Sequence, residues 1–441
     1  MGPVRWARLC VEVTGGDPVK PTHTKALALI VLGSFVTAPA LAEEPVIGEV
    51  LQILKDRGLI DEAKHSELVA KNSSYEEEHK SLLGRIEWSG DFRARLENFW
   101  HSEDGLGSQR ANRTRARYRL RLGGKARIND FTKVVFRIAS GEGDHRSTNR
   151  TLGKGDDFDP DSIFIDRAYI ELKAPKGWIG EGNGLKLLAG KTKNPFRWKN
   201  GKDYMLFDSD VNPEGGALLF ETQPLERLRA YLTAGYYVID ENSKSEDPHF
   251  TGIQGGVDLD LSETLRLGGR ASWYSFASLN PAFLERASNV GAATDDDFRV
   301  LELAGYLKVE SVPDWPVLLY GHYARNVDAG RVSTSTGSDE DTGWGVGVEL
   351  GDKKKFAKLG FGYYRLEANF FPAQFIDSDL FDGKTNRKGF TFYGSRQILP
   401  GTDLNITLFK GEELHGALPV YASSVKDADR IRLQTDIVVK F

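Results

Sequence analysis

From Arg85 onward the sequence alternates between apolar and polar residues with a period of two, and this alternation constrains the fold more than any other feature. Side chains of a β-strand point alternately to opposite faces, so the pattern predicts strands with one apolar and one polar face. One such strand would also suit a soluble sheet. In the segment 85–99 the apolar face carries Ile86, Trp88, Phe92, Ala94 and Leu96.

The alternation recurs in about sixteen segments of roughly ten residues, separated alternately by tight turns and long polar loops. This repetition predicts an all-β fold, a transmembrane antiparallel β-barrel over residues 83–441. An even strand number with both ends on the periplasmic side places every long loop outside. The expected strands are 85–99, 113–128, 131–140, 163–173, 185–192, 217–222, 228–238, 250–261, 265–276, 298–309, 316–326, 342–350, 357–371, 389–398, 404–411 and 430–441.

Two segments precede the predicted barrel. The apolar run 26–40 is too short for a membrane-spanning helix and leads to Ala40-Leu41-Ala42, a small-x-small cleavage site, so residues 1–42 are interpreted as a signal peptide with an unusually long start. Residues 43–82 predict a periplasmic helical hairpin that stops at Gly58 and resumes near Asp61. Its role is open between an oligomerisation element and a cap on the barrel mouth.

Composition excludes several classes of protein. With 40% hydrophobic and 27% charged residues, the chain is too polar for a bundle of membrane-spanning helices. The single cysteine, Cys10, lies in the predicted leader, so neither disulfides nor thiolate chemistry are expected after export. A net charge of -5 gives no support to nucleic-acid binding.

The segment 430–441 is the clearest strand, because Ile431, Leu433, Ile437, Val439 and Phe441 alternate with polar residues as far as the last residue. A terminal aromatic residue on an amphipathic strand resembles the signal that the barrel-assembly machinery recognises, and Phe441 is assigned that role. Other aromatic residues near strand ends are expected to form lipid-facing belts. The outer belt would hold Phe99, Trp100, Trp273, Phe276, Phe370 and Phe371, and the inner belt Trp315, Phe356 and Phe441.

Several segments together resemble the putative porin family of Proteobacteria. They are Ser89 to Arg95, Arg113 to Leu122, Ala189 to Phe196, and Phe207 to Gly215. The resemblance covers most of residues 83–441 and extends to the helical hairpin. It implies a pore-forming outer-membrane barrel and leaves the solute open. Analogy with sixteen-stranded general porins further implies a homotrimer whose third loop folds into the pore.

If the apolar faces meet lipid, the charged faces line the pore, because a midplane Arg or Lys costs roughly 2 to 4 kcal/mol. Two interpretations of the resulting arginine ladder stay open. The arginines are either neutralised internally by Glu87, Asp91, Glu97 and Glu171, or they form an electropositive wall that attracts anionic solutes. The ladder consists of Arg93, Arg95, Arg113, Arg115, Arg117, Arg119, Arg121, Arg137 and Arg167.

The third long loop, about 193–216, carries Asp203, Asp208, Asp210 and Glu214. By the general-porin resemblance these acids would face the arginines and form a constriction. If the loop stays outside, they are ordinary solvated charges. The acidic clusters 156–161 and 295–297 match no calcium-loop spacing, so no metal or cofactor is expected.

The favoured function is passive diffusion of small hydrophilic solutes, including anions, and not an enzymatic reaction. The expected partners are outer-membrane lipid, these solutes, two further copies in a homotrimer and the assembly machinery. One alternative is a structural or adhesive barrel plugged by its loops. A phospholipase-type barrel is the other, and it would require His322 beside a serine on the lipid face.

Overall fold

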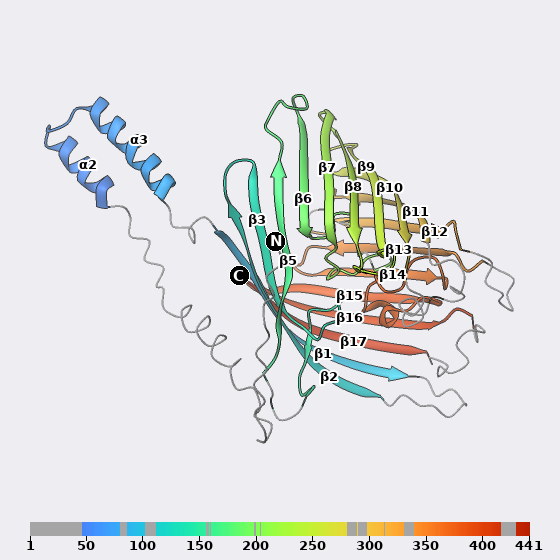
Figure 1. Ribbon diagram of the computed structural model, residues 1–441. Helices are drawn as coiled ribbons and strands as arrows, with labels where there is room; N and C mark the ends of the chain where they lie inside the picture. Colours follow the sequence, from blue (N-terminus) through green and yellow to red (C-terminus); the bar gives the residue numbers. More distant parts are fainter. Residues whose placement is uncertain are drawn as a thin grey trace, which may run out of the picture. The chain divides into compact units, whose positions relative to one another are not determined.

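The computed structural model describes residues 46–79, 86–101, 112–155, 158, 160–197, 200–202, 204–279, 289, 298–312, 314–329, 339–415 and 429–441 (Figure 1). The chain divides into two compact units, Met1–Lys80 and Ser81–Phe441. The signal-peptide prediction for residues 1–42 lies outside the described residues.

The first unit contains two helices, α2 (Val46–Asp56) and α3 (Glu62–His79). Gly58 follows α2 with φ +68°, a left-handed conformation that favours glycine, and its N–H donates to the Lys55 carbonyl at 2.8 Å. Asp61 caps α3, because its Oδ1 accepts a hydrogen bond from the Lys64 N–H at 2.7 Å. The predicted pair of helices is thus confirmed. Within the described residues, no helix is long and apolar enough to cross a membrane.

In the part of the chain that the structure describes, the second unit is a closed antiparallel barrel of sixteen long strands, as predicted, with one additional two-residue strand, β4. Consecutive long strands are neighbours, and the ring closes because β1 pairs with both β2 and β17 (Figure 1). The strands are β1 (Ile86–His101), β2 (Arg113–Arg127), β3 (Thr132–Ser140), β4 (Arg150–Thr151), β5 (Ile163–Lys173), β6 (Asn183–Lys191), β7 (Glu214–Leu225), β8 (Leu228–Val238), β9 (His249–Asp260), β10 (Leu265–Ala277), β11 (Phe298–Val309), β12 (Val317–Asn326), β13 (Thr342–Gly351), β14 (Lys358–Leu366), β15 (Arg387–Leu399), β16 (Thr402–Glu413) and β17 (Arg430–Lys440).

The period-two pattern sets the two faces of the wall. On β1 the apolar residues Trp88, Phe92 and Leu96 are exposed on the outside, whereas Arg95 and Glu97 are buried inside. A barrel whose outer surface is apolar and whose inner surface is charged reverses the arrangement of a soluble protein. The structure thereby places the charged side of β1 in the lumen.

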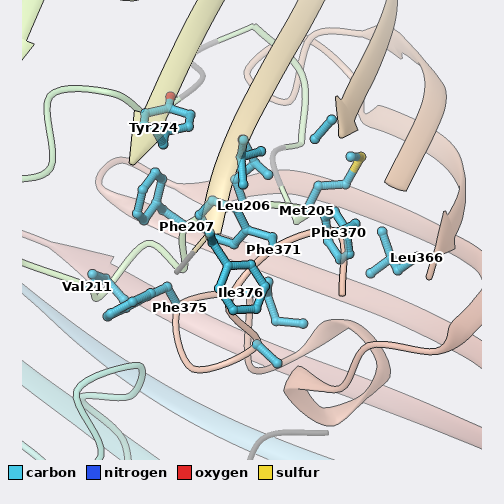
Figure 2. Packing of buried hydrophobic residues seen from close by; sticks show 14 of the residues in the cluster. Met205, Leu206, Phe207, Val211, Tyr274, Leu366, Phe370, Phe371, Phe375 and Ile376 are labelled. Atoms are coloured by element: carbon cyan, nitrogen blue, oxygen red, sulfur yellow. The ribbon is translucent and has the colours of Figure 1, made fainter. Parts of the chain in front are cut away.

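Inside the barrel lies a hydrophobic core that the strand pattern does not predict. We define the second loop as residues 141–162, the third loop as 192–213 and the seventh loop as 367–386. The third and seventh loops fold inward and pack on aromatic residues of β8 to β11 (Figure 2). The core residues that these two loops contribute are Phe196, Tyr204, Met205, Leu206, Phe207, Val211, Phe370, Phe371, Ala373, Phe375, Ile376, Leu380 and Phe381.

This core corrects two sequence predictions. The expected strand 357–371 ends at Leu366, because the residues that follow leave the sheet and turn into the lumen. The expected outer belt is also partly wrong, since Phe99, Phe276, Phe370 and Phe371 are at most 1% exposed. Phe99 and Phe276 share the inward face of their strands with Arg95 and Arg270, and Phe370 and Phe371 lie beyond the end of β14 on the seventh loop. Trp100, Trp273, Trp315, Phe356 and Phe441 remain on the exposed outer face.

Candidate functional site

Strand register brings the arginines of β1 and β2 together. Arg93 lies opposite Arg119, and Arg95 lies opposite Arg117. Side chains directly opposite on one face of an antiparallel pair are close neighbours, so like charges here repel unless other groups intervene. The same register also brings carboxylates into the ladder, with Asp91 opposite Arg121 and Glu97 opposite Arg115.

These two carboxylates of β1 pair with arginines of β2. Asp91 accepts hydrogen bonds from Arg119 at 2.6 Å and from Arg121 at 2.7 Å. Glu97 is fully buried and accepts one from Arg115 Nε at 2.7 Å. Glu87 and Glu171, also considered as partners, contact Lys125 and Lys133 instead.

A second set of charges reaches the ladder from β17 and from the seventh loop. Asp436 on β17 receives two parallel hydrogen bonds from Arg95, at 2.7 and 2.8 Å, the fork geometry that makes arginine–carboxylate pairs strong. Asp379 of the seventh loop accepts from Arg95 at 3.0 Å and from Arg432 at 2.7 Å. Arg432 also donates to Glu97.

The third loop contributes less charge than the sequence suggested. Asp210 accepts from Arg121 at 3.1 Å, and its other oxygen accepts from the Thr148 hydroxyl of the second loop at 2.9 Å. Asp208 is buried and faces the seventh loop, where the Ser378 N–H donates to it at 2.8 Å. Glu214 is not part of this cluster, because it begins β7 and pairs with Lys191. Asp203 lies outside the described residues.

The remaining predicted arginines are spread along the wall. Arg137 pairs with Asp166, and Arg167 donates to the Asn212 side-chain oxygen at 2.7 Å. Arg113 is exposed at one end of β2, with its guanidinium 4.8 Å from the centre of the Phe99 ring. The Arg115, Arg430 and Arg432 guanidiniums lie 4.5 to 5.3 Å from the same ring, so Phe99 packs under four cations by cation–π contact.

A buried polar network on the inner face of β9 to β12 holds the third loop. The Phe196 carbonyl accepts hydrogen bonds from Arg270 at 2.8 Å and from Gln254 at 3.0 Å. Arg270 also pairs with Glu302, and Glu302 contacts His322 Nε2 at 2.7 Å. His322 therefore faces the lumen, and not the lipid side where a phospholipase would require it.

Burial and mutual repulsion separate the pKa values of the loop carboxyls. Burial and the neighbouring Asp379 raise the pKa of Asp377 to about 7, and burial beside Asp377 and Asp210 raises the pKa of Asp208 well above its usual value. Arg121 and Arg119 lower the pKa of Asp210 to about 2, while Arg95 and Arg432 hold the pKa of Asp379 well below normal. Of these four acids, Asp210 and Asp379, the two beside the ladder, are thus strongly held in the charged form.

Sequence reasoning missed the seventh loop and the contribution of β17. The run Phe370-Phe371-Pro-Ala-Gln-Phe375-Ile376 is unusually apolar for a surface loop, and this signal could have identified a segment that turns inward. The alternation on β17 already placed Arg430, Arg432 and Asp436 on the polar face. Their pairing with β1 could not be known before closure of the ring was established.

A cavity of about 930 Å³ lies beside the third loop, against β5 to β11. Its lining includes the cations Lys173, Lys176, Lys186, Arg197, Arg229 and Arg270, and the carboxylates Glu181, Glu221 and Asp258. The cavity shows that the inserted loops leave water-accessible space inside the wall.

Within the residues described, no group of three or more His, Cys, Asp or Glu side chains could hold a metal ion. Of the two acidic clusters considered for calcium, Asp156, Asp157, Asp159 and residues 295–297 lie outside that part of the chain. Asp161 pairs with Arg150.

Comparison with known proteins gives one family and several similar folds. Residues 97–283 match the model of a family described as putative porin. A high-pH structure of Pseudomonas putida OprB is 11% identical, covers 83% of this chain and 97% of its own, and has a TM-score of 0.53. No curated protein matches the chain.

Two further structures show weaker likeness. Salmonella typhi OmpF in complex with daunomycin is 13% identical, covers 81% of this chain and 97% of its own, and has a TM-score of 0.47. The outer membrane channel DcaP of Acinetobacter baumannii is 12% identical with the same coverages and a TM-score of 0.43. Of these three structures, OprB supports the barrel fold, with a TM-score above 0.5.

Proposed function

We propose that the chain is a member of the putative porin family, whose model residues 97–283 match, and that it lets small hydrophilic solutes, anions in particular, diffuse passively through its lumen. Family and fold support an outer-membrane porin channel, and they point to a channel rather than an enzyme. The preference for anions is the finer part of the proposal and rests on the charges of the wall.

The observation that carries it is the balance of charge around the ladder. Among the described residues, eight arginines of β1, β2 and β17 meet six carboxylates within ion-pair distance, so neutralisation is extensive but incomplete. The arginines are Arg93, Arg95, Arg115, Arg117, Arg119, Arg121, Arg430 and Arg432, and the carboxylates are Asp91, Glu97, Asp210, Asp379, Asp382 and Asp436. A local excess of positive charge in a low-dielectric channel concentrates anions whatever the net charge of the whole protein.

Ion selectivity in a planar bilayer tests the proposal. Purified protein should give stepwise currents, and the reversal potential in a potassium chloride gradient should show preference for chloride. Replacing Arg117 and Arg119 with Gln removes two cations and leaves Asp91 less neutralised, so selectivity should shift toward potassium. Lys125→Gln is the matched control, because Lys125 is exposed and lies 3.8 Å from Glu87. Absence of current, or an unchanged reversal potential in the double variant, would refute it.

The hydrophobic core also supports a second function, that of a structural barrel plugged by its own loops, because the inserted loops pack tightly inside the barrel. The same bilayer experiment separates the two. A barrel that inserts with intact fold yet conducts nothing is the plugged one.

The proposal also covers the location of the protein, its oligomeric state and its assembly into the membrane. The short turns would face the periplasm and the long loops the outside, in a homotrimer embedded in outer-membrane lipid, with residues 1–42 removed as a signal peptide. Phe441 would serve as the assembly signal. Supporting this role, its side chain is 62% exposed, and its N–H donates to the Gly90 carbonyl at 3.2 Å where β1 and β17 join.

A further inference from the structure

Arg93 and Arg117, neighbours in the ladder, stand beyond hydrogen-bond distance of their nearest carboxylates. The ion pairs of Arg93 and Arg117 are long, 3.9 Å to Asp436 and 3.9 Å to Glu97. Hydrogen bonds to carboxylates are about 2.7 to 2.9 Å, so neither contact is one. By contrast, Arg115 on the same strand as Arg117 makes a direct hydrogen-bonded ion pair, with its Nε 2.7 Å from a Glu97 carboxylate oxygen.

The two arginines also lie together. Since Arg93 is opposite Arg119 and Arg95 is opposite Arg117, Arg93 and Arg117 are diagonal neighbours on the inner face. Such neighbours are about 7 to 8 Å apart at the backbone, within reach of long side chains. Their side chains are 12% and 10% exposed, and the Nε–H group of each is buried without a hydrogen-bond partner.

Among the described residues of the second loop, the side chains that accept hydrogen bonds from these guanidiniums are neutral. Arg93 donates to the Asn149 side-chain oxygen, and Arg117 donates to the Ser147 hydroxyl at 3.3 Å. Asn149 and Ser147 are buried and joined by a hydrogen bond of 3.0 Å. Neutral acceptors satisfy some of the N–H groups, and the nearest carboxylates stand 3.9 Å away, so both positive charges are compensated at long range and without a direct hydrogen bond. Incomplete pairing of a buried charge is costly.

We propose that Arg93 and Arg117, held by Asn149 and Ser147, form a binding site for one oxyanion, the carboxylate or phosphate group of a passing solute. A planar guanidinium binds either group through paired N–H donors. The site rests on the proposed function, because a conducting lumen brings solutes to it. It would be a discrete, saturable binding site along the permeation pathway, distinct from the general attraction of anions by the positively charged wall.

Block of single-channel current tests the site on the full chain. Inorganic phosphate and malonate, each added to a potassium chloride background, probe the two anion classes. At least one should reduce the current with a saturating concentration dependence, and the probe that does so identifies the group that the site accepts. In Arg93→Gln/Arg117→Gln the half-blocking concentration should rise about tenfold or more, the factor for loss of a charge-assisted hydrogen bond. The control Arg115→Gln should change it by less than about twofold.

A second variant keeps all the arginines. Asn149→Asp supplies a built-in carboxylate to Arg93 and should abolish block while leaving conductance in chloride. Conduction without saturable block by either probe would overturn the site but leave the channel intact, as would equal effects of Arg115→Gln and the double variant. Absence of any current in chloride would instead refute the proposed function.

Discussion

Truncating Phe207 to alanine is expected to loosen the third loop from the seventh loop while the barrel wall stays closed. Phe207 is 1% exposed in the centre of the lumenal core (Figure 2). Its ring centre lies 5.2 Å from that of Phe371 on the seventh loop, and 5.4 Å and 5.9 Å from those of Tyr274 and Phe250 on the wall. The side chain therefore joins both loops to the strands.

The magnitude follows from its burial. Deleting a buried phenylalanine ring costs about 3 to 5 kcal/mol through lost transfer energy and the cavity left behind. Because about 1.4 kcal/mol is a factor of ten, the ratio of detached to packed third loop should rise roughly 10²- to 10³-fold. The wall is held by strand pairing that Phe207 does not join, so the loss falls on the loops.

Open-channel noise in single-channel recordings would measure this loosening, because a detached loop moves in the current path. Migration of unheated and heated protein on a denaturing gel would report whether the barrel remains folded. Phe158→Ala is the control, since Phe158 is fully exposed in the second loop. If noise and conductance match the wild type in a folded Phe207→Ala barrel, the loop core does not restrain the pore and the reasoning is wrong.

Three further outcomes are expected. Because the pKa of Asp377 is raised to about 7 from 3.8, the packed seventh loop binds more protons than a detached one between about pH 4 and 7, so packing should weaken as pH rises through that window. Open-channel noise should rise with pH, and Asp377→Asn should reduce the dependence, because the raised pKa of Asp208 acts in the same direction. Gly90→Ala would place a Cβ 2.5 Å from the Phe441 ring and 2.7 Å from the Arg121 carbonyl oxygen. It should lower the free energy of barrel unfolding by about 1 to 3 kcal/mol, seen as a lower unfolding temperature in the gel-shift assay. Arg270→Leu leaves Glu302 buried without its arginine partner and removes a hydrogen bond to the Phe196 carbonyl of the third loop. The free energy of barrel unfolding should fall by about 3 to 5 kcal/mol, seen as a lower unfolding temperature in the same gel assay. An unchanged unfolding temperature would count against a stabilising role of this network.

Much of the wall could be predicted from the sequence because its information is local. Alternation decides which side of each strand is apolar, so the positions of Trp88 and Leu96 outside and of Arg95 and Glu97 inside follow from residue order alone. The helix stop at Gly58 and the cap at Asp61 are equally local, since each depends on hydrogen bonds within four or five residues.

The pore interior depends on contacts between residues far apart in the chain, and only the tertiary structure decided it. Alternation places Phe99 and Phe276 on the inward face, but it cannot say that arginines of β2 and β17 cover one of them and the seventh loop the other. It marks Arg95 as inward facing, but its partners Asp436 and Asp379 come from the closing strand and the seventh loop, hundreds of residues away in sequence. The sequence by itself determined the barrel and its charged face; ring closure and loop insertion determined which of those charges are paired, because pairing depends on distances that a strand pattern does not contain.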